Sequence, residues 1–258
     1  MPFVQSSGLR LHYIEEGEGP PLVWLPGGND SAALMMHAHR RLAARVRLIC
    51  LDPRGQGESD APTEADDYAP DRYAGDVLAL LDALGLDRPV VGGHSRGGRT
   101  SVELALRHPE RVRAVIAAAS PLLGSTGDRE PGFRRYQRVL AEEGVDAFLA
   151  LLRSAPRHPE RHAMWRAAAH RAGPSALFAQ YEALSRLGPL TERARELAVP
   201  GLFLTGERDF LRDHAETVAT AAPSGRFALI PNAGHALFAD NAAAYFAELD
   251  AFLDRVLV

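Results

Sequence analysis

Short apolar runs alternate with amphipathic stretches along most of the chain. The runs predict an exposed strand at residues 9–15 and buried strands at 22–25, 47–51, 89–92, 112–117, 202–205 and 227–230. Helical stretches lie at residues 31–44, 70–84, 98–107, 211–222 and 240–256. Val77, Leu80, Leu81 and Leu84, for example, recur at the spacing of one helix face. Strands that alternate with helices predict an α/β fold with a mostly parallel sheet covered by helices.

The pattern changes between residues 121 and 197. Only helical stretches occur there, separated by proline and glycine, and the strand pattern returns after Pro200. We therefore expect one α/β core, formed by residues 1–120 and 198–258, with residues 121–197 inserted as a helical unit. A sequential second domain fits this order less well.

The segment Gly93-His94-Ser95-Arg96-Gly97 has the pattern G-x-S-x-G directly after an apolar strand and directly before a helix. In this context the pattern is typical of a nucleophile elbow, a tight turn that exposes a serine hydroxyl beside a helix N-terminus. Bulky residues two positions either side of the serine would clash in so tight a turn. Ser95 is therefore the predicted nucleophile, and a structural glycine-rich turn is the alternative.

Composition limits the remaining possibilities. The chain has 258 residues, is 46% hydrophobic and carries a net charge of −4, which leaves no basic footprint for nucleic acid. No apolar run approaches the ~18 residues of a membrane span, and the N-terminus shows no secretory pattern. We expect a cytoplasmic protein with a small-molecule substrate, no nucleic-acid or membrane partner, and a monomeric or homodimeric state.

Several chemistries are excluded by residue usage. All 29 basic residues are arginines, so lysine Schiff-base chemistry and lysine-dependent phosphate loops are impossible. Metal-site spacings such as HExxH or paired CxxC are absent, and the single cysteine, Cys50, is a predicted core thiol. We expect no metal and no organic cofactor.

Three segments together resemble the α/β-hydrolase fold family: the elbow, Asp-Pro-Arg-Gly-Gln-Gly-Glu-Ser-Asp at 52–60, and Asn-Ala-Gly-His at 232–235. The resemblance covers essentially the whole chain, and residues 121–197 match the variable helical cap. It implies a chain order of serine, acid and histidine, which selects Ser95, Asp209 and His235. Asp209 matches the family's Gly-x-x-Asp pattern, and Glu207 and Asp213 are the alternatives within reach.

The residues themselves favour His235 as the base. A serine hydroxyl needs a neighbouring base to take its proton. His235 follows a strand end and a glycine, at the sheet edge where open α/β folds bind ligands. The other histidines lie mostly in helices or the cap. His94 adjoins the nucleophile, but neighbouring residues of an elbow point apart, so we interpret it as a packing residue.

By resemblance, one oxyanion donor is the backbone N–H of Arg96, and the second comes from the loop after Leu25. Many relatives carry His-Gly in this loop, whereas this chain has Pro26-Gly27-Gly28. We predict Gly28 as the second donor, with Gly27 as the alternative.

The substrate contacts are less specific. Arg96 and Arg99 flank the elbow, and each fits either an ion pair at the sheet edge or an anchor for a substrate carboxylate. Aromatic residues of the cap fit either a pocket lining or the cap's own core. Arg99, Trp165 and Tyr136 are the predicted substrate-binding residues. The full aromatic set is Phe133, Tyr136, Trp165, Phe178 and Tyr181.

These features favour a serine hydrolase that cleaves a carboxylic ester or lactone through an acyl-enzyme, similar to the 3-oxoadipate enol-lactonase group. Arg99 four residues after the serine resembles succinyl-cyclohexadiene-carboxylate synthase, so a carbon–carbon lyase or hydrolase is the main alternative. A non-catalytic binding module is a third class. Dehalogenases and epoxide hydrolases are disfavoured, because these relatives usually carry Asp at the position of Ser95.

Overall fold

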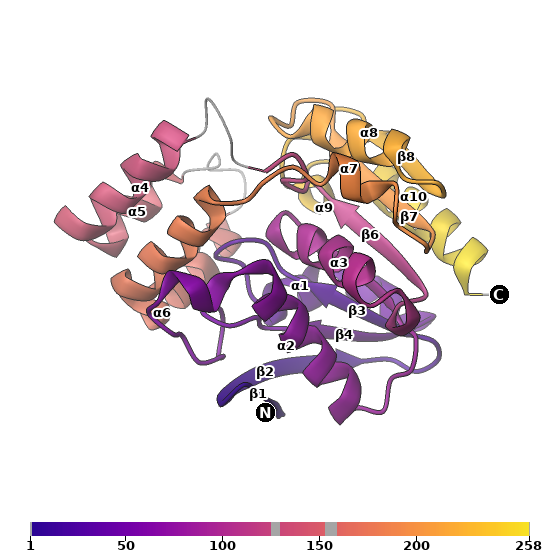
Figure 1. Ribbon diagram of the computed structural model, residues 1–258, viewed down its shortest axis with the longest axis horizontal. Coiled ribbons are helices and arrows are strands. Elements are labelled where there is room, and N and C mark those ends of the chain that lie inside the picture. Colours follow the sequence, from indigo (N-terminus) through magenta and orange to yellow (C-terminus); the bar gives the residue numbers. More distant parts are fainter. Residues whose placement is uncertain (1, 125–129, 153–158, 258) are drawn as a thin grey trace.

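The computed structural model describes residues 2–124, 130–152 and 159–257, without the side chains of residues 130–133, 160 and 161. Its centre is an eight-stranded sheet (Figure 1). In spatial order the strands are β1 (Phe3–Ser6), β2 (Leu9–Glu16), β4 (Arg47–Leu51), β3 (Pro21–Leu25), β5 (Val90–His94), β6 (Ala114–Ala118), β7 (Gly201–Gly206) and β8 (Gly225–Ile230). β2 pairs antiparallel with β1 and β4, and all other neighbours are parallel. The predicted α/β sheet is confirmed.

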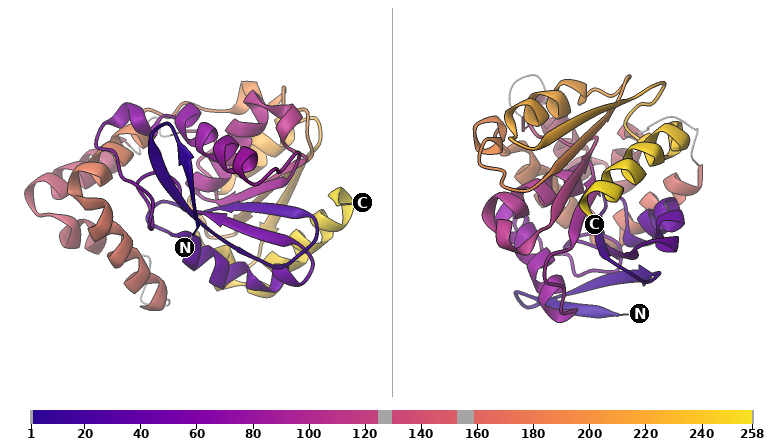
Figure 2. Two further views of the ribbon diagram at one scale, coloured as in Figure 1. Left: turned by 90° about the horizontal axis from the view of Figure 1, so that it is seen from below. Right: turned by 90° about the vertical axis from the view of Figure 1, so that its right-hand side faces the viewer.

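Helices cover both faces of the sheet (Figure 2). Successive residues of a strand face opposite sides, so Val23 and Leu25 of β3 join one apolar cluster while Leu22 and Trp24 join the other. The first cluster includes α2 (Pro70–Ala83), α3 (Arg96–Arg107) and α8 (Arg212–Ala221). The second includes α1 (Ala32–His39), α9 (Leu237–Asp240) and α10 (Ala242–Val256). None of the helices in the described ranges has the length and apolar character that a bilayer crossing requires.

Three local features differ from the pattern-based expectations. β1 is not predicted, because only four residues alternate there and only Val4 and Ser6 are buried. The expected helix at 31–44 ends at His39 and continues as a 3₁₀ turn, Arg40–Ala44. The expected final helix is interrupted at Asn241, whose side chain caps α10 by accepting the Ala244 N–H at 3.2 Å.

Among the described residues, four helices lie between β6 and β7 in the sequence: α4 (Glu130–Glu142), α5 (Val145–Leu151), α6 (Pro159–Ser185) and α7 (Thr191–Ala194). The first three stand to one side of the sheet layers (Figure 1) and share a separate apolar cluster that includes Phe148 and Leu177. α6 is kinked at Gly173, where φ is 79°, directly before Pro174. We refer to residues 121–197 as the cap, and their division from the core stays a prediction.

Candidate active site

Ser95 sits in a strained turn between the last residue of β5 and the first residue of α3. Its φ is 51° and its ψ −117°, a conformation uncommon outside glycine. A Cβ on Gly97 would lie 2.2 Å from the Leu25 carbonyl oxygen, and one on Gly93 would lie 2.4 Å from the Gly97 carbonyl carbon. Both flanking positions therefore require glycine. The turn places Ser95 at the carboxyl edge of the sheet and at the N-terminus of α3.

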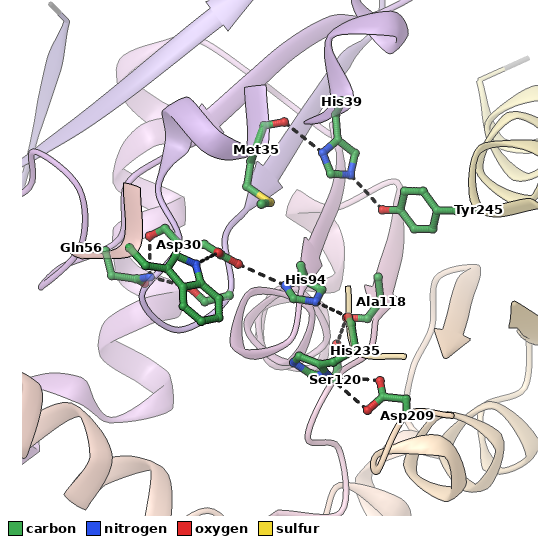
Figure 3. Close-up of polar contacts among 12 residues, drawn as sticks. Asp30, Met35, His39, Gln56, His94, Ala118, Ser120, Asp209, His235 and Tyr245 are labelled. Carbon is green, nitrogen blue, oxygen red and sulfur yellow. Dashed lines mark hydrogen bonds and ion pairs between the residues drawn. The ribbon is translucent and has the colours of Figure 1, made fainter. Parts of the chain in front are cut away.

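Asp209 and His235 follow β7 and β8, two neighbouring parallel strands, and so reach the same sheet edge. Nδ1 of His235 lies 3.2 Å from each carboxylate oxygen of Asp209 (Figure 3). Because an ionised carboxylate can only accept, Nδ1 carries the proton and donates it. Nε2 then keeps its lone pair and can accept a proton from another group.

The environment of Asp209 keeps its carboxylate ionised. Burial alone would raise the pKa of Asp209, but the hydrogen bond from His235 lowers it, helped by the Leu211 N–H. The Leu211 N–H donates to Oδ1 at 3.1 Å. The net result is a pKa below the ordinary value of 3.8.

The other two acid candidates have different surroundings. Glu207 is exposed and accepts the Asn232 N–H at 2.9 Å, and Asp213 is exposed on α8. Among the residues that the structure describes, Asp209 is the acid that hydrogen-bonds the His235 ring. Phe210 stacks on that ring with centroids 5.1 Å apart and planes at 28°, and it is itself 69% exposed. The imidazole is therefore held at one edge by the carboxylate and on one face by an aromatic ring.

The loop after β3 approaches Ser95 closely. A Cβ on Gly27 would lie 3.2 Å from the Ser95 Cβ, whereas a Cβ on Gly28 would meet no atom of the described chain within 4 Å. Gln56 holds this loop, because its Nε2 donates to the carbonyls of Gly27 at 2.5 Å and Asp30 at 3.0 Å. Gly28 thus has open space beside it. Its assignment as an oxyanion donor, like that of the Arg96 N–H in the first turn of α3, stays a prediction.

Asp52, the first residue of the 52–60 segment, hydrogen-bonds to two other parts of the core. Its Oδ1 accepts the Ala32 N–H at 2.6 Å, at the start of α1, and its Oδ2 lies 2.7 Å from Nδ1 of His12. Burial raises the pKa of Asp52, partly opposed by the His12 hydrogen bond. The carboxylate therefore joins the loop after β4 to β2 and α1.

The two arginines of the elbow helix have well-defined contacts. Arg96 Nη1 donates to Gln180 of the cap at 2.9 Å, and its guanidinium lies 5.1 Å from the Tyr73 ring centre. Arg99 is buried. Its guanidinium donates to Glu103 Oε1 at 3.1 Å and to the carbonyls of Pro121 and Gly188 at 2.9 Å, and burial lowers its pKa. Arg99 therefore forms an ion pair with Glu103, which is one of the two roles that the sequence allows for it.

The cap aromatics divide between the cap core and the loop after β3. Tyr136 packs edge-on against Phe148 and Tyr181 within the cap cluster, at 5.9 and 5.5 Å. The Trp165 indole N–H donates to Oδ1 of Asp30, and the Tyr181 hydroxyl accepts from Asn29 at 3.0 Å. Phe178 is 37% exposed, and the Phe133 side chain lies outside the described residues.

The sequence pattern did not indicate two polar residues that contact this site, His94 and Asp30. His94, interpreted there as a packing residue, places Nε2 2.8 Å from the His235 carbonyl oxygen and Nδ1 3.3 Å from Oδ2 of Asp30 (Figure 3). Asp30 was not singled out. The sequence offers one signal for each of them. His94 is a polar residue at the end of a buried strand, and Asp30 is an acid between Gly27-Gly28 and Ser31, the N-cap of α1.

Comparisons with known proteins agree with the fold. A family model described as alpha/beta hydrolase fold matches residues 20–157. Bifunctional epoxide hydrolase 2 of Sus scrofa is 36% identical over 125 residues, which are 48% of this chain and 22% of that enzyme, so the chain spans less than a quarter of that relative. A putative 2-succinyl-6-hydroxy-2,4-cyclohexadiene-1-carboxylate synthase of Bacillus subtilis is 28% identical over 92% of both chains. The crystal structure of the enol-lactonase from Burkholderia xenovorans LB400 has a TM-score of 0.84 at 27% identity, covering 98% of this chain and all of that one.

Proposed function

The chain belongs to the α/β-hydrolase fold family of enzymes, and from this premise we propose that it is a serine hydrolase of small to medium carboxylic esters or lactones. One observation carries the proposal. The Asp209–His235 hydrogen bond leaves Nε2 free as a base at the sheet edge where the Ser95 turn also lies. A serine, a base and an ionised acid in this order suit acyl transfer.

The proposed reaction proceeds through an acyl-enzyme. Ser95 Oγ attacks the substrate carbonyl while Nε2 of His235 takes its proton, and the backbone N–H groups of Arg96 and Gly28 bind the oxyanion. Collapse breaks the C–O bond, and His235 returns the proton to the leaving oxygen. Water then attacks the acyl-enzyme with His235 as base and releases the carboxylic acid. With a lactone, the acid and the alcohol remain in one molecule.

Epoxide opening suits this nucleophile poorly, although epoxide hydrolases are among the relatives. A serine oxygen that opens an epoxide forms an ether to the protein. An ether has no carbonyl for water to attack, so the enzyme would be alkylated once and would stop. An ester of Ser95 can be hydrolysed, which supports the ester or lactone reaction.

A second candidate is a carbon–carbon lyase or hydrolase acting on an acidic substrate. The Bacillus subtilis relative matches along nearly the whole chain, and Arg99 would be the anchor for a substrate carboxylate. Such an anchor has to compete with Glu103 and two backbone carbonyls for the same guanidinium. Trp165 and Tyr136 are the proposed cap contacts in either reaction.

Labelling with a fluorophosphonate probe tests the assignment of the nucleophile. Wild-type protein should be labelled and should hydrolyse p-nitrophenyl acetate, and Ser95→Ala should lose both. Labelling that survives the substitution contradicts the proposal. Inert esters, together with release of pyruvate from an acidic enolisable substrate, would favour the lyase instead.

A further inference from the structure

The Asp30 carboxylate is fully buried and is reached by donors from two distant parts of the chain. Its side chain has 0% exposure, and that of His94 has 1%. Trp165 of α6 donates to Oδ1, and the His94 ring faces Oδ2 from the end of β5. Burying a carboxylate carries a large desolvation cost unless it is paired, so these contacts define where Asp30 can sit.

The hydrogen-bond partners of His94 require a proton between its Nδ1 and Oδ2 of Asp30. Nε2 faces the backbone carbonyl of His235, and a carbonyl can only accept, so Nε2 carries a proton. A neutral imidazole then presents a lone pair at Nδ1, towards an oxygen of Asp30. Two lone pairs repel, so the pair holds an additional proton, as an imidazolium with a carboxylate or as an imidazole with a carboxylic acid. Both forms are neutral overall.

The His94–Asp30 pair that shares this proton lies next to His235, the proposed base. The ring centres of His94 and His235 are 4.8 Å apart, and the His94 N–H holds the backbone of His235 itself. Gly27 packs against the same pair, because a Cβ there would lie 2.8 Å from Nδ1 of His94 and 2.9 Å from Oδ2 of Asp30. The pair therefore lies beneath both the base and the loop after β3.

We propose that Asp30 is a positioning residue for hydrolysis: with His94 it holds one proton that fixes the backbone of His235, and through Trp165 it couples that position to the cap. The proposal rests on the proposed function, since it assumes that His235 is the base.

Two substitutions of Asp30 separate hydrogen bonding from charge. In Asp30→Asn the amide oxygen can accept from Trp165 and the amide N–H can donate to a neutral His94, so we expect kcat for p-nitrophenyl acetate within about threefold of wild type. Asp30→Leu keeps the branching at Cγ, is larger and has no polar group. There we expect kcat to fall ~100-fold with little change in KM, as for a base displaced by a fraction of an ångström. Asparagine as damaging as leucine would overturn the shared-proton argument.

A double-mutant cycle tests the coupling to the cap. Trp165→Phe removes the indole N–H and keeps an aromatic ring, so we expect kcat to fall about tenfold in wild type. In the Asp30→Leu background it should cause no further loss, because the acceptor is gone. Losses that multiply would overturn the coupling. If Asp30→Leu fails to fold, His94→Phe, which keeps a ring against Phe238, should show the same loss of kcat.

A matched control comes from Asp76, another buried carboxylate, which pairs with Arg54 at 2.6 Å. Asp76→Asn should lower the melting temperature while kcat stays within about threefold. Turnover that survives Ser95→Ala would contradict the proposed function and this proposal with it. Loss of turnover in Ser95→Ala together with unchanged kcat in Asp30→Leu would overturn this proposal alone.

Discussion

Replacing Asp209 by asparagine should disable the base without moving it. The Leu211 N–H donates to Oδ1 at 3.1 Å, so the asparagine places its carbonyl oxygen there and turns its NH₂ towards His235. The NH₂ group takes the place of Oδ2, 3.2 Å from Nδ1, and favours the tautomer in which Nδ1 is unprotonated and accepts from it. In that tautomer the imidazole proton lies on Nε2, and the ring can no longer accept a proton from Ser95.

The expected loss of kcat in Asp209→Asn follows from losing the His235 tautomer that carries its proton on Nδ1. Asparagine at the acid of a serine triad costs about 10⁴-fold in kcat, equivalent to ~5 kcal/mol of transition-state stabilisation. Steady-state hydrolysis of p-nitrophenyl acetate measures this, with thermal unfolding as the check that the fold is intact. Glu207→Gln and Asp213→Asn are matched controls, and both should keep kcat within about threefold. An Asp209→Asn variant with more than a tenth of wild-type kcat, or a larger loss in either control, would show that Asp209 does not set the tautomer of His235.

Three further predictions concern neighbouring residues. Gly27→Ala should lower kcat by ~100-fold, because its Cβ would lie 2.8 Å from Nδ1 of His94 and must displace that ring; wild-type kcat would contradict the close approach. Arg99→Leu should reduce the free energy of unfolding by about 2 kcal/mol in urea titrations, since Glu103 loses its buried partner but keeps Arg193 at 2.7 Å. An unchanged KM for a carboxylate-bearing ester in that variant would rule out the anchor role. Because the pKa of Asp209 is lowered on folding, its stabilising contribution is present above pH ~3.8 and lost as pH falls further. The melting temperatures of wild type and Asp209→Asn should therefore converge in acid, and a constant difference would contradict the shift.

The central strands of the sheet were predictable because they are buried on both faces. Runs such as β6, with all five residues buried, stand out from the amphipathic helices around them. The elbow was predictable for a similar reason, since the glycines on each side of Ser95 are required by local close approach. Short edge elements such as β1 carry too few alternating residues to be detected.

The buried polar network could not be predicted in the same way. Asp30 meets His94 and Trp165 across 64 and 135 residues of sequence, and nothing in its local surroundings specifies either partner. Arg99 likewise bonds Gly188, 89 residues away. Such pairings depend on how the cap returns over the sheet, which hydrophobic periodicity does not encode.

The point at which the cap leaves the sheet has a consequence for engineering. Ser95 precedes β6, and Asp209 and His235 follow β7, so the cap lies in the sequence between the two halves of the proposed reactive centre. A cap grafted from another protein at these junctions would change the surface that covers the site while leaving Ser95, Asp209 and His235 in the turns and loops of the core. A grafted cap of the right length must also meet one chemical requirement. It must bring a hydrogen-bond donor to the place of the Trp165 indole, or Asp30 will be buried without its partner from the cap.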